Sequence, residues 1–188
     1  MKYNPVIHHR RSIRLKGYDY SQPCAYFITI CTHNRECLFG EIVDRSMVLN
    51  KFGLFVQNEW KNTSLVRRNV IVDEYIVMPN HVHGILIITD DDTDHRRGVL
   101  QYAPTVSHEF PLSDTNTFHS PSKTIGAIIR GFKSATTKQI NQMRQSPGIP
   151  VWQRNYHERI IRNENELNKI RHYIINNLLN WTNDDYYQ

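Results

Sequence analysis

The sequence predicts an α+β fold, in which an antiparallel sheet of about five strands carries helices mainly on one face. Short segments rich in β-branched and aromatic residues alternate with longer segments whose apolar residues recur at helical spacing. Several of the strand-like segments are neighbours joined by short polar turns. Local hairpins with helices between them are typical of this class.

The strands are predicted from composition and from the turns that separate them. The segments with strand character are residues 25–33, 36–50, 70–78 and 82–89. The polar turn at residues 44–46 divides the second segment into two short strands. The dipeptide Pro79-Asn80 is a turn signal between the last two segments.

Three helices are predicted from apolar spacing, at residues 51–66, 123–144 and 164–181. Between the last two, residues 151–161 indicate a short strand or turn. Residues 90–121 are acidic and then rich in His, Ser, Thr and Pro, with little periodicity. We therefore expect a flexible insertion there.

Length and composition describe an ordinary globular chain. Its 188 residues suit a single domain over residues 1–188, with 39% hydrophobic and 22% charged residues. No apolar run is long enough to span a bilayer, and the first twenty residues lack the apolar core of a signal peptide. We therefore expect a cytoplasmic protein that does not bind membranes.

The net charge is +5 and the isoelectric point is about 9.2. Basic residues gather at the N-terminus, in the 123–144 helix and near the C-terminus. Any one of these groups reads most simply as a solvated surface, but three of them favour a nucleic-acid partner. The candidate DNA contacts are Arg10, Arg11, Arg14, Lys16, Arg130 and Lys133.

Two histidines interrupt the apolar run EYIVMPNHVHGILII at residues 74–88. In a strand, residues two apart point to the same face, so His81 and His83 would project together while Val82 points into the core. Two imidazoles placed in this way can share a divalent ion. A bare His-x-His is common by chance, however, and exposed or hydrogen-bonded histidines are the simpler reading of the pair alone.

The wider sequence context resembles a known family. MPNHVHGILI is similar to the His-hydrophobic-His (HUH) motif of single-tyrosine transposases, in particular the REP-associated tyrosine transposases and their insertion-sequence relatives. AYFITICTHNRECLFG, SKTIGAIIRGFKSATTKQIN and VWQRNYHERIIRNENELNKIRHYIINN resemble further blocks of the same family, so the likeness covers most of the chain. It implies a DNA strand transferase that acts on single-stranded DNA folded into hairpins.

The resemblance also implies a nucleophile and a third metal ligand. The family places its tyrosine in a Tyr-Ile-x-x-Asn stretch, which Tyr173 to Asn177 match. Residues four apart share a helix face, so one helix could supply both the nucleophile Tyr173 and the oxygen ligand Asn177. Tyr156 is the other tyrosine in this region, and it aligns with an aromatic position that looks structural. A half-buried helix residue is the ordinary alternative for Tyr173.

The implied reaction and cofactor follow from this donor set. Tyr173 would attack a DNA phosphodiester to form a 5′-phosphotyrosine. His81, His83 and Asn177 would hold Mg²⁺ or Mn²⁺. The family commonly has proline just after the asparagine, but this chain has Leu178, so the helix could run on toward Trp181.

A different class of function stays open. The chain could be a non-catalytic DNA- or RNA-binding module on the same ferredoxin-like sheet. Such a module does not need His81, His83, Tyr173 and Asn177 together, and their joint presence favours the enzyme. The sequence leaves open whether the protein acts as a monomer or as a homodimer.

Overall fold

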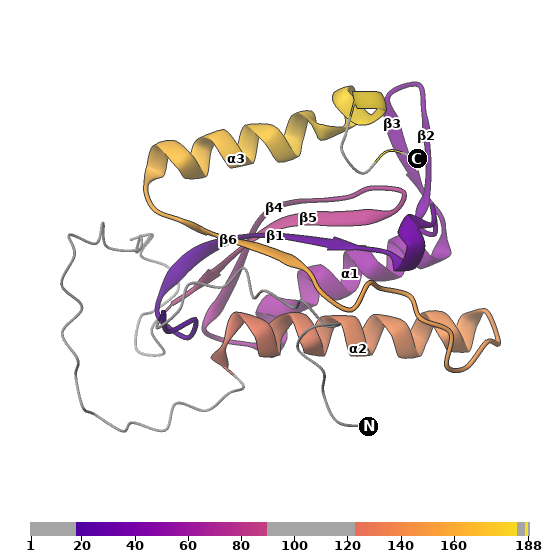
Figure 1. The fold of residues 1–188 in the computed structure, drawn as a ribbon, viewed down its shortest axis with the longest axis horizontal. Coiled ribbons are helices and arrows are strands. Elements are labelled where there is room, and N and C mark those ends of the chain that lie inside the picture. The colour runs from indigo at the N-terminus through magenta and orange to yellow at the C-terminus, as the bar shows by residue number, and fades with distance from the viewer. Residues whose placement is uncertain (1–17, 90–122, 184–186, 188) are drawn as a thin grey trace, which may run out of the picture.

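The computed structural model describes residues 18–89, 123–183 and 187 (Figure 1). The elements in chain order are β1 (Cys24–Cys31), η1 (His33–Arg35), β2 (Gly40–Val43), β3 (Ser46–Leu49), α1 (Lys51–Val66), β4 (Val70–Val77), β5 (His81–Ile88), α2 (Ile125–Met143), β6 (His157–Ile161), α3 (Glu164–Asn176) and η3 (Asn177–Asn183). The expected insertion at 90–121 lies outside the described residues, as do Arg10, Arg11, Arg14 and Lys16.

The predicted α+β class with an antiparallel sheet is confirmed. The main sheet has the order β4-β5-β1-β6, and every neighbouring pair is antiparallel. With α1 and α2 as the two connections, the strand, helix, strand, strand, helix, strand order is the ferredoxin-like arrangement. The sheet has four strands instead of about five, because β2 and β3 pair only with each other in a separate hairpin.

Helices cover both faces of the sheet, two on one side and one on the other (Figure 1). Alternate residues of β1, among them Tyr26 and Ile28, pack in the larger core with α1 and α2. The residues between them, such as Ala25 and Phe27, belong to the smaller core with α3. This division follows from the two-residue period of a strand, and it places α3 on the sheet face opposite to α1 and α2.

The last helix ends earlier than the sequence predicts. Regular α-helix stops at Asn176, and a 3-10 helix continues from Asn177 to Asn183. 3-10 turns are frequent at the ends of α-helices, although a run of 7 residues is longer than most. No helix among the described residues is both long and apolar enough to cross a bilayer.

Strand β5 packs closely against α1 at Gly84, one residue beyond the histidine pair. A Cβ atom at this position would lie 2.5 Å from Cζ2 of Trp60 and 2.8 Å from its Cε2. The Trp60 side chain is buried and makes an edge contact with Phe132 of α2, at a centroid distance of 5.1 Å. The indole therefore has little room to move away.

We expect Gly84→Ala to lower the free energy of unfolding by ~2 kcal/mol, because overpacking forces a buried ring from its position. Urea denaturation measures the change. Gly131→Ala is the matched control, because its new Cβ would lie 3.4 Å from the flexible Arg67 guanidinium in the exposed middle of α2. There we expect a gain of about 0.5–1 kcal/mol. Equal effects of the two substitutions would contradict this account of Gly84.

Candidate functional site

His81 and His83 lie on the central strand β5, on the face that α3 covers. Both side chains are buried, and their ring centroids are 4.4 Å apart. The pairing of β5 with β1 sets His83 directly opposite Thr29 and His81 opposite Cys31. The expectation that the two imidazoles project together from one strand face therefore holds in the structure.

The side chain of Asn80 determines which ring nitrogen of His81 carries the hydrogen. The amide nitrogen of Asn80 donates to the carbonyl oxygen of Arg35 at 3.2 Å, which turns Oδ1 of Asn80 toward Nδ1 of His81 at 2.8 Å. Since that oxygen can only accept, Nδ1 carries the hydrogen and Nε2 carries the lone pair. Burial, followed by the nearby Arg35 charge, lowers the pKa of His81 to about 3, so the ring is neutral at pH 7.

His83 is held from two sides. Its Nδ1 lies 2.8 Å from Oγ1 of Thr29, and its Nε2 lies 3.3 Å from the hydroxyl of Tyr173. The Thr29 hydroxyl can donate or accept, so the Thr29 contact is compatible with either tautomer of the ring. A strand histidine is thus oriented by one hydroxyl from β1 and faces a second from α3.

Tyr173 reaches His83 because α3 docks on this face through an aliphatic stripe. Leu167, Ile170 and Ile174 are the buried residues of the helix, and they pack in the smaller core. Tyr173 lies at the edge of that stripe and is 45% exposed. Its ring makes an edge contact with Phe27, at a centroid distance of 6.0 Å. The phenol is therefore oriented by contacts while one side remains open to solvent.

Asn177 lies one helical turn beyond Tyr173 and is buried, with 2% exposure. Four residues further along the chain, the Trp181 ring lies 6.0 Å from the His81 ring, centroid to centroid. The segment from Tyr173 to Trp181 therefore passes along the histidine pair, contacting His83 first and His81 later. Asn177 stands between these two contacts.

The donor set at this face suits a hard or borderline divalent cation. In the described part of the chain, no group of three or more His, Cys, Asp or Glu side chains is arranged to hold a metal. Two imidazoles lie together here, and the buried Asn177 lies in the chain between Tyr173 and Trp181, whose rings contact them. Imidazole nitrogen is a borderline ligand that suits metals such as Zn²⁺ and Ni²⁺, whereas amide oxygen suits Mg²⁺ and Mn²⁺.

Other residues that the sequence suggested lie elsewhere. Tyr156 packs against the core on the α1 and α2 side, and its hydroxyl donates to Oε2 of Glu158 at 2.7 Å. Arg130 and Lys133 belong to α2, on the face of the sheet that does not carry the histidine pair. The Lys133 ammonium donates to the carbonyl oxygens of residues 153–155, which gives it a structural contact.

Sequence reasoning missed the residues that orient the two imidazoles. Thr29 is far from His83 in the chain and meets it only through the β1 and β5 register. Asn80 was read as half of a turn dipeptide, although its side chain also contacts His81. Its position directly before the histidine was the one local signal for this role.

Comparison with known proteins yields a relative in Haemophilus influenzae. No protein-family model matches the chain. Among solved structures, a REP-associated tyrosine transposase bound to a REP hairpin is similar, with a TM-score of 0.49 and 15% identity over 89% of this chain and 73% of that one. A candidate transposase from Deinococcus radiodurans has a TM-score of 0.44 and 14% identity, over 88% of this chain and 97% of the other. Both TM-scores are below 0.5.

The sequence relative is much closer. The Haemophilus influenzae protein, described only as uncharacterized, is 43% identical over 186 residues. The match spans 99% of this chain and 97% of the relative. Identity at this level over nearly the full length of both proteins shows that the chain belongs to the same family as the uncharacterized Haemophilus influenzae protein.

Proposed function

We propose that the protein is a metal-dependent DNA strand transferase of the single-tyrosine HUH transposase class, with Tyr173 as the nucleophile. The observation that carries the proposal is the 3.3 Å distance between the Tyr173 hydroxyl and Nε2 of His83. Tyr173 and His83 are 90 residues apart in sequence and lie on different elements. A hydroxyl within hydrogen-bond reach of an imidazole nitrogen is placed beside a group that can activate or orient it.

In the proposed reaction, the Tyr173 oxygen attacks the phosphorus of a DNA phosphodiester. The new bond joins that oxygen to phosphorus, the bond from phosphorus to the 3′ oxygen breaks, and the phenol proton is lost as the 3′-hydroxyl gains one. The product is a 5′-phosphotyrosine, which keeps the energy of the bond for rejoining. Because Tyr173 is 45% exposed, its ring can be approached by DNA from solvent.

His81, His83 and Asn177 would hold the divalent cation, Mg²⁺ or Mn²⁺. Such an ion, when bound, polarises the scissile phosphate and stabilises the charge that develops on it. Neighbouring side chains orient two of the proposed ligands, His81 and His83. Asn80 orients the His81 ring through Nδ1, which puts the lone pair on Nε2, and Thr29 orients the His83 ring.

The proposed substrate is single-stranded DNA that contains a hairpin. This partner follows from the resemblance of the sequence to the REP-associated tyrosine transposases, together with the net charge of +5. The basic residues at the N-terminus remain the proposed contacts to hairpin phosphates, whereas Arg130 and Lys133 lie on the other side of the sheet.

We expect Tyr173→Phe to abolish covalent adduct formation with single-stranded hairpin oligonucleotides in Mn²⁺, a loss of at least ~1000-fold. Loss of one hydroxyl removes the nucleophile and leaves the docked ring in place. A denaturing gel with labelled DNA measures the adduct, and a filter-binding assay measures DNA affinity, which we expect to change less than about two-fold.

Tyr156→Phe is the matched control, because it removes a tyrosine hydroxyl on the opposite side of the sheet. We expect it to form the adduct at the wild-type rate. An adduct from the Tyr173→Phe protein would contradict the proposal. Tight binding of hairpin DNA by the wild type, without an adduct across a broad hairpin panel, would favour a non-catalytic binding module.

We expect His81→Ala to weaken Mn²⁺ binding by at least ~10-fold, because it removes one of three proposed ligands. Electron paramagnetic resonance of free Mn²⁺ measures the affinity without any need for DNA or turnover. The control is His172→Ala, which removes an exposed histidine of α3 that lies next to Tyr173 in sequence. Equal Mn²⁺ affinities of the two variants would overturn the proposed metal site.

A further inference from the structure

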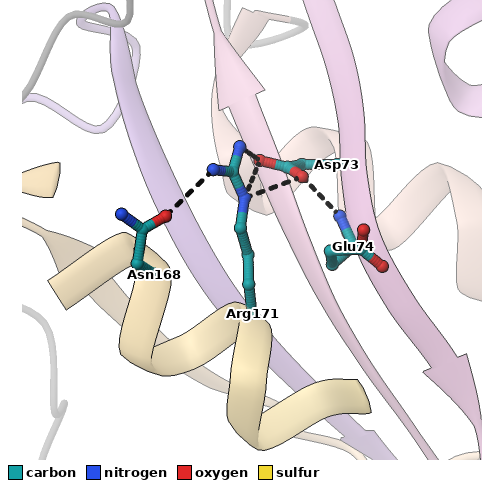
Figure 2. Close-up of polar contacts among 4 residues, drawn as sticks. All are labelled: Asp73, Glu74, Asn168 and Arg171. Carbon is teal, nitrogen blue, oxygen red and sulfur yellow. Dashed lines mark hydrogen bonds and ion pairs between the residues drawn. The ribbon is translucent and has the colours of Figure 1, made fainter. Parts of the chain in front are cut away.

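A charged contact joins α3 to the edge strand β4. The Arg171 guanidinium donates through Nε to both carboxylate oxygens of Asp73, at 3.2 and 3.1 Å, and through Nη2 to Oδ2 at 2.6 Å (Figure 2). A further bond runs from Nη1 to Asn168 on the preceding turn of the helix. The Asp73 side chain is only 13% exposed and that of Arg171 is 33% exposed.

Strand β4 departs from regular pairing at this point. Val72 pairs with Leu86, and the next paired residue, Tyr75, meets Gly84. Asp73 and Glu74 therefore lie together opposite the single residue that separates those partners, which is the arrangement of a β-bulge. The backbone N–H of Glu74 donates to Oδ1 of Asp73 at 2.7 Å (Figure 2). Asp73 lies two residues beyond Ile71, which packs in the smaller core, so strand alternation already places it on the α3 side, and the Glu74 N–H in the bulge supplies one of its donors.

Arg171 and Tyr173 stand on opposite flanks of the helix. Two residues apart, they are separated by about 160° around the helix axis. The buried stripe of Leu167, Ile170 and Ile174 lies between them. Arg171 contacts β4 on one side, and Tyr173 contacts His83 of β5 on the other.

Aliphatic contacts alone define the rotation of a helix poorly, because they have no preferred direction. A bidentate arginine contact on one flank does define it, because the planar guanidinium fits the carboxylate in few orientations. A small rotation of α3 away from Asp73 would move the Tyr173 hydroxyl relative to His83. We propose that Asp73 and Arg171 are positioning residues that set the reach of Tyr173 to the histidine pair, an inference that rests on the proposed function of Tyr173.

The test uses Asp73→Asn, Arg171→Gln and the double variant. We expect each single substitution to slow adduct formation at saturating hairpin DNA by ~10-fold, because misplacing a reacting group by a fraction of an ångström is costly. The double variant should be no slower than either single, because the two residues act as one unit. We expect the dissociation constant for DNA to stay within about two-fold of wild type, which a general loss of structure would not allow.

Two control variants each remove a charge close to one member of the pair, the first near Arg171 and the second next to Asp73. Lys169→Gln changes an exposed residue of α3, and Glu74→Gln changes the exposed neighbour of Asp73 in the bulge. We expect both to react at the wild-type rate. Wild-type rates for Asp73→Asn and Arg171→Gln, or losses that multiply in the double variant, would overturn the inference.

Hydrogen exchange provides a readout that does not depend on catalysis. We expect the amides of α3 to exchange ~10-fold faster than wild type in both single variants. The double variant should exchange no faster than the single variants, and β1 and β5 should keep their protection. If wild type forms no adduct but this exchange pattern is found, the proposed function fails and the docking role of the pair stands. If wild type is active but α3 exchange and adduct rates are unchanged in the variants, the pair has no positioning role.

Discussion

The geometry of the site depends on the register of β5 between β4 and β1. Because side chains alternate along a strand, a slip of one residue would move His81 and His83 to the α1 side and bring Val82 to the α3 side. The pairing of His83 with Thr29 and the close packing of Gly84 under Trp60 both fit the observed register. Two independent contacts, one on each face, thus hold the histidine pair toward α3.

The second requirement is that α3 dock on that same face. Its aliphatic stripe supplies attraction, and its start is stabilised by Asn163, whose side chain accepts from the Glu166 amide. A second charged contact, from Arg159 of β6 to Glu166, joins the first turn of the helix to the opposite edge of the sheet. The helix is therefore tethered to both edge strands, while Tyr173 faces the strands between them.

Local periodicity made much of this predictable from sequence. The shared face of His81 and His83 follows from the strand period, and the helix period predicts a shared side for Tyr173 and Asn177. The features that the sequence did not predict depend on contacts between segments far apart in the chain. The local sequence of β2 and β3 contains no signal that these strands pair only with each other and stay outside the main sheet. Nor does local sequence say which face α2 covers, and the candidate DNA contacts Arg130 and Lys133 lie on the face away from the histidine pair.

The central claim is that Tyr173 forms a covalent bond with DNA, and mass spectrometry of the linked residue tests it most directly. The wild-type protein would be incubated with hairpin oligonucleotides and Mn²⁺, digested with nuclease and trypsin, and sequenced by fragmentation. We expect a nucleotide on the tryptic peptide that begins at His172, with the added mass on Tyr173. A nucleotide on any other residue would contradict it.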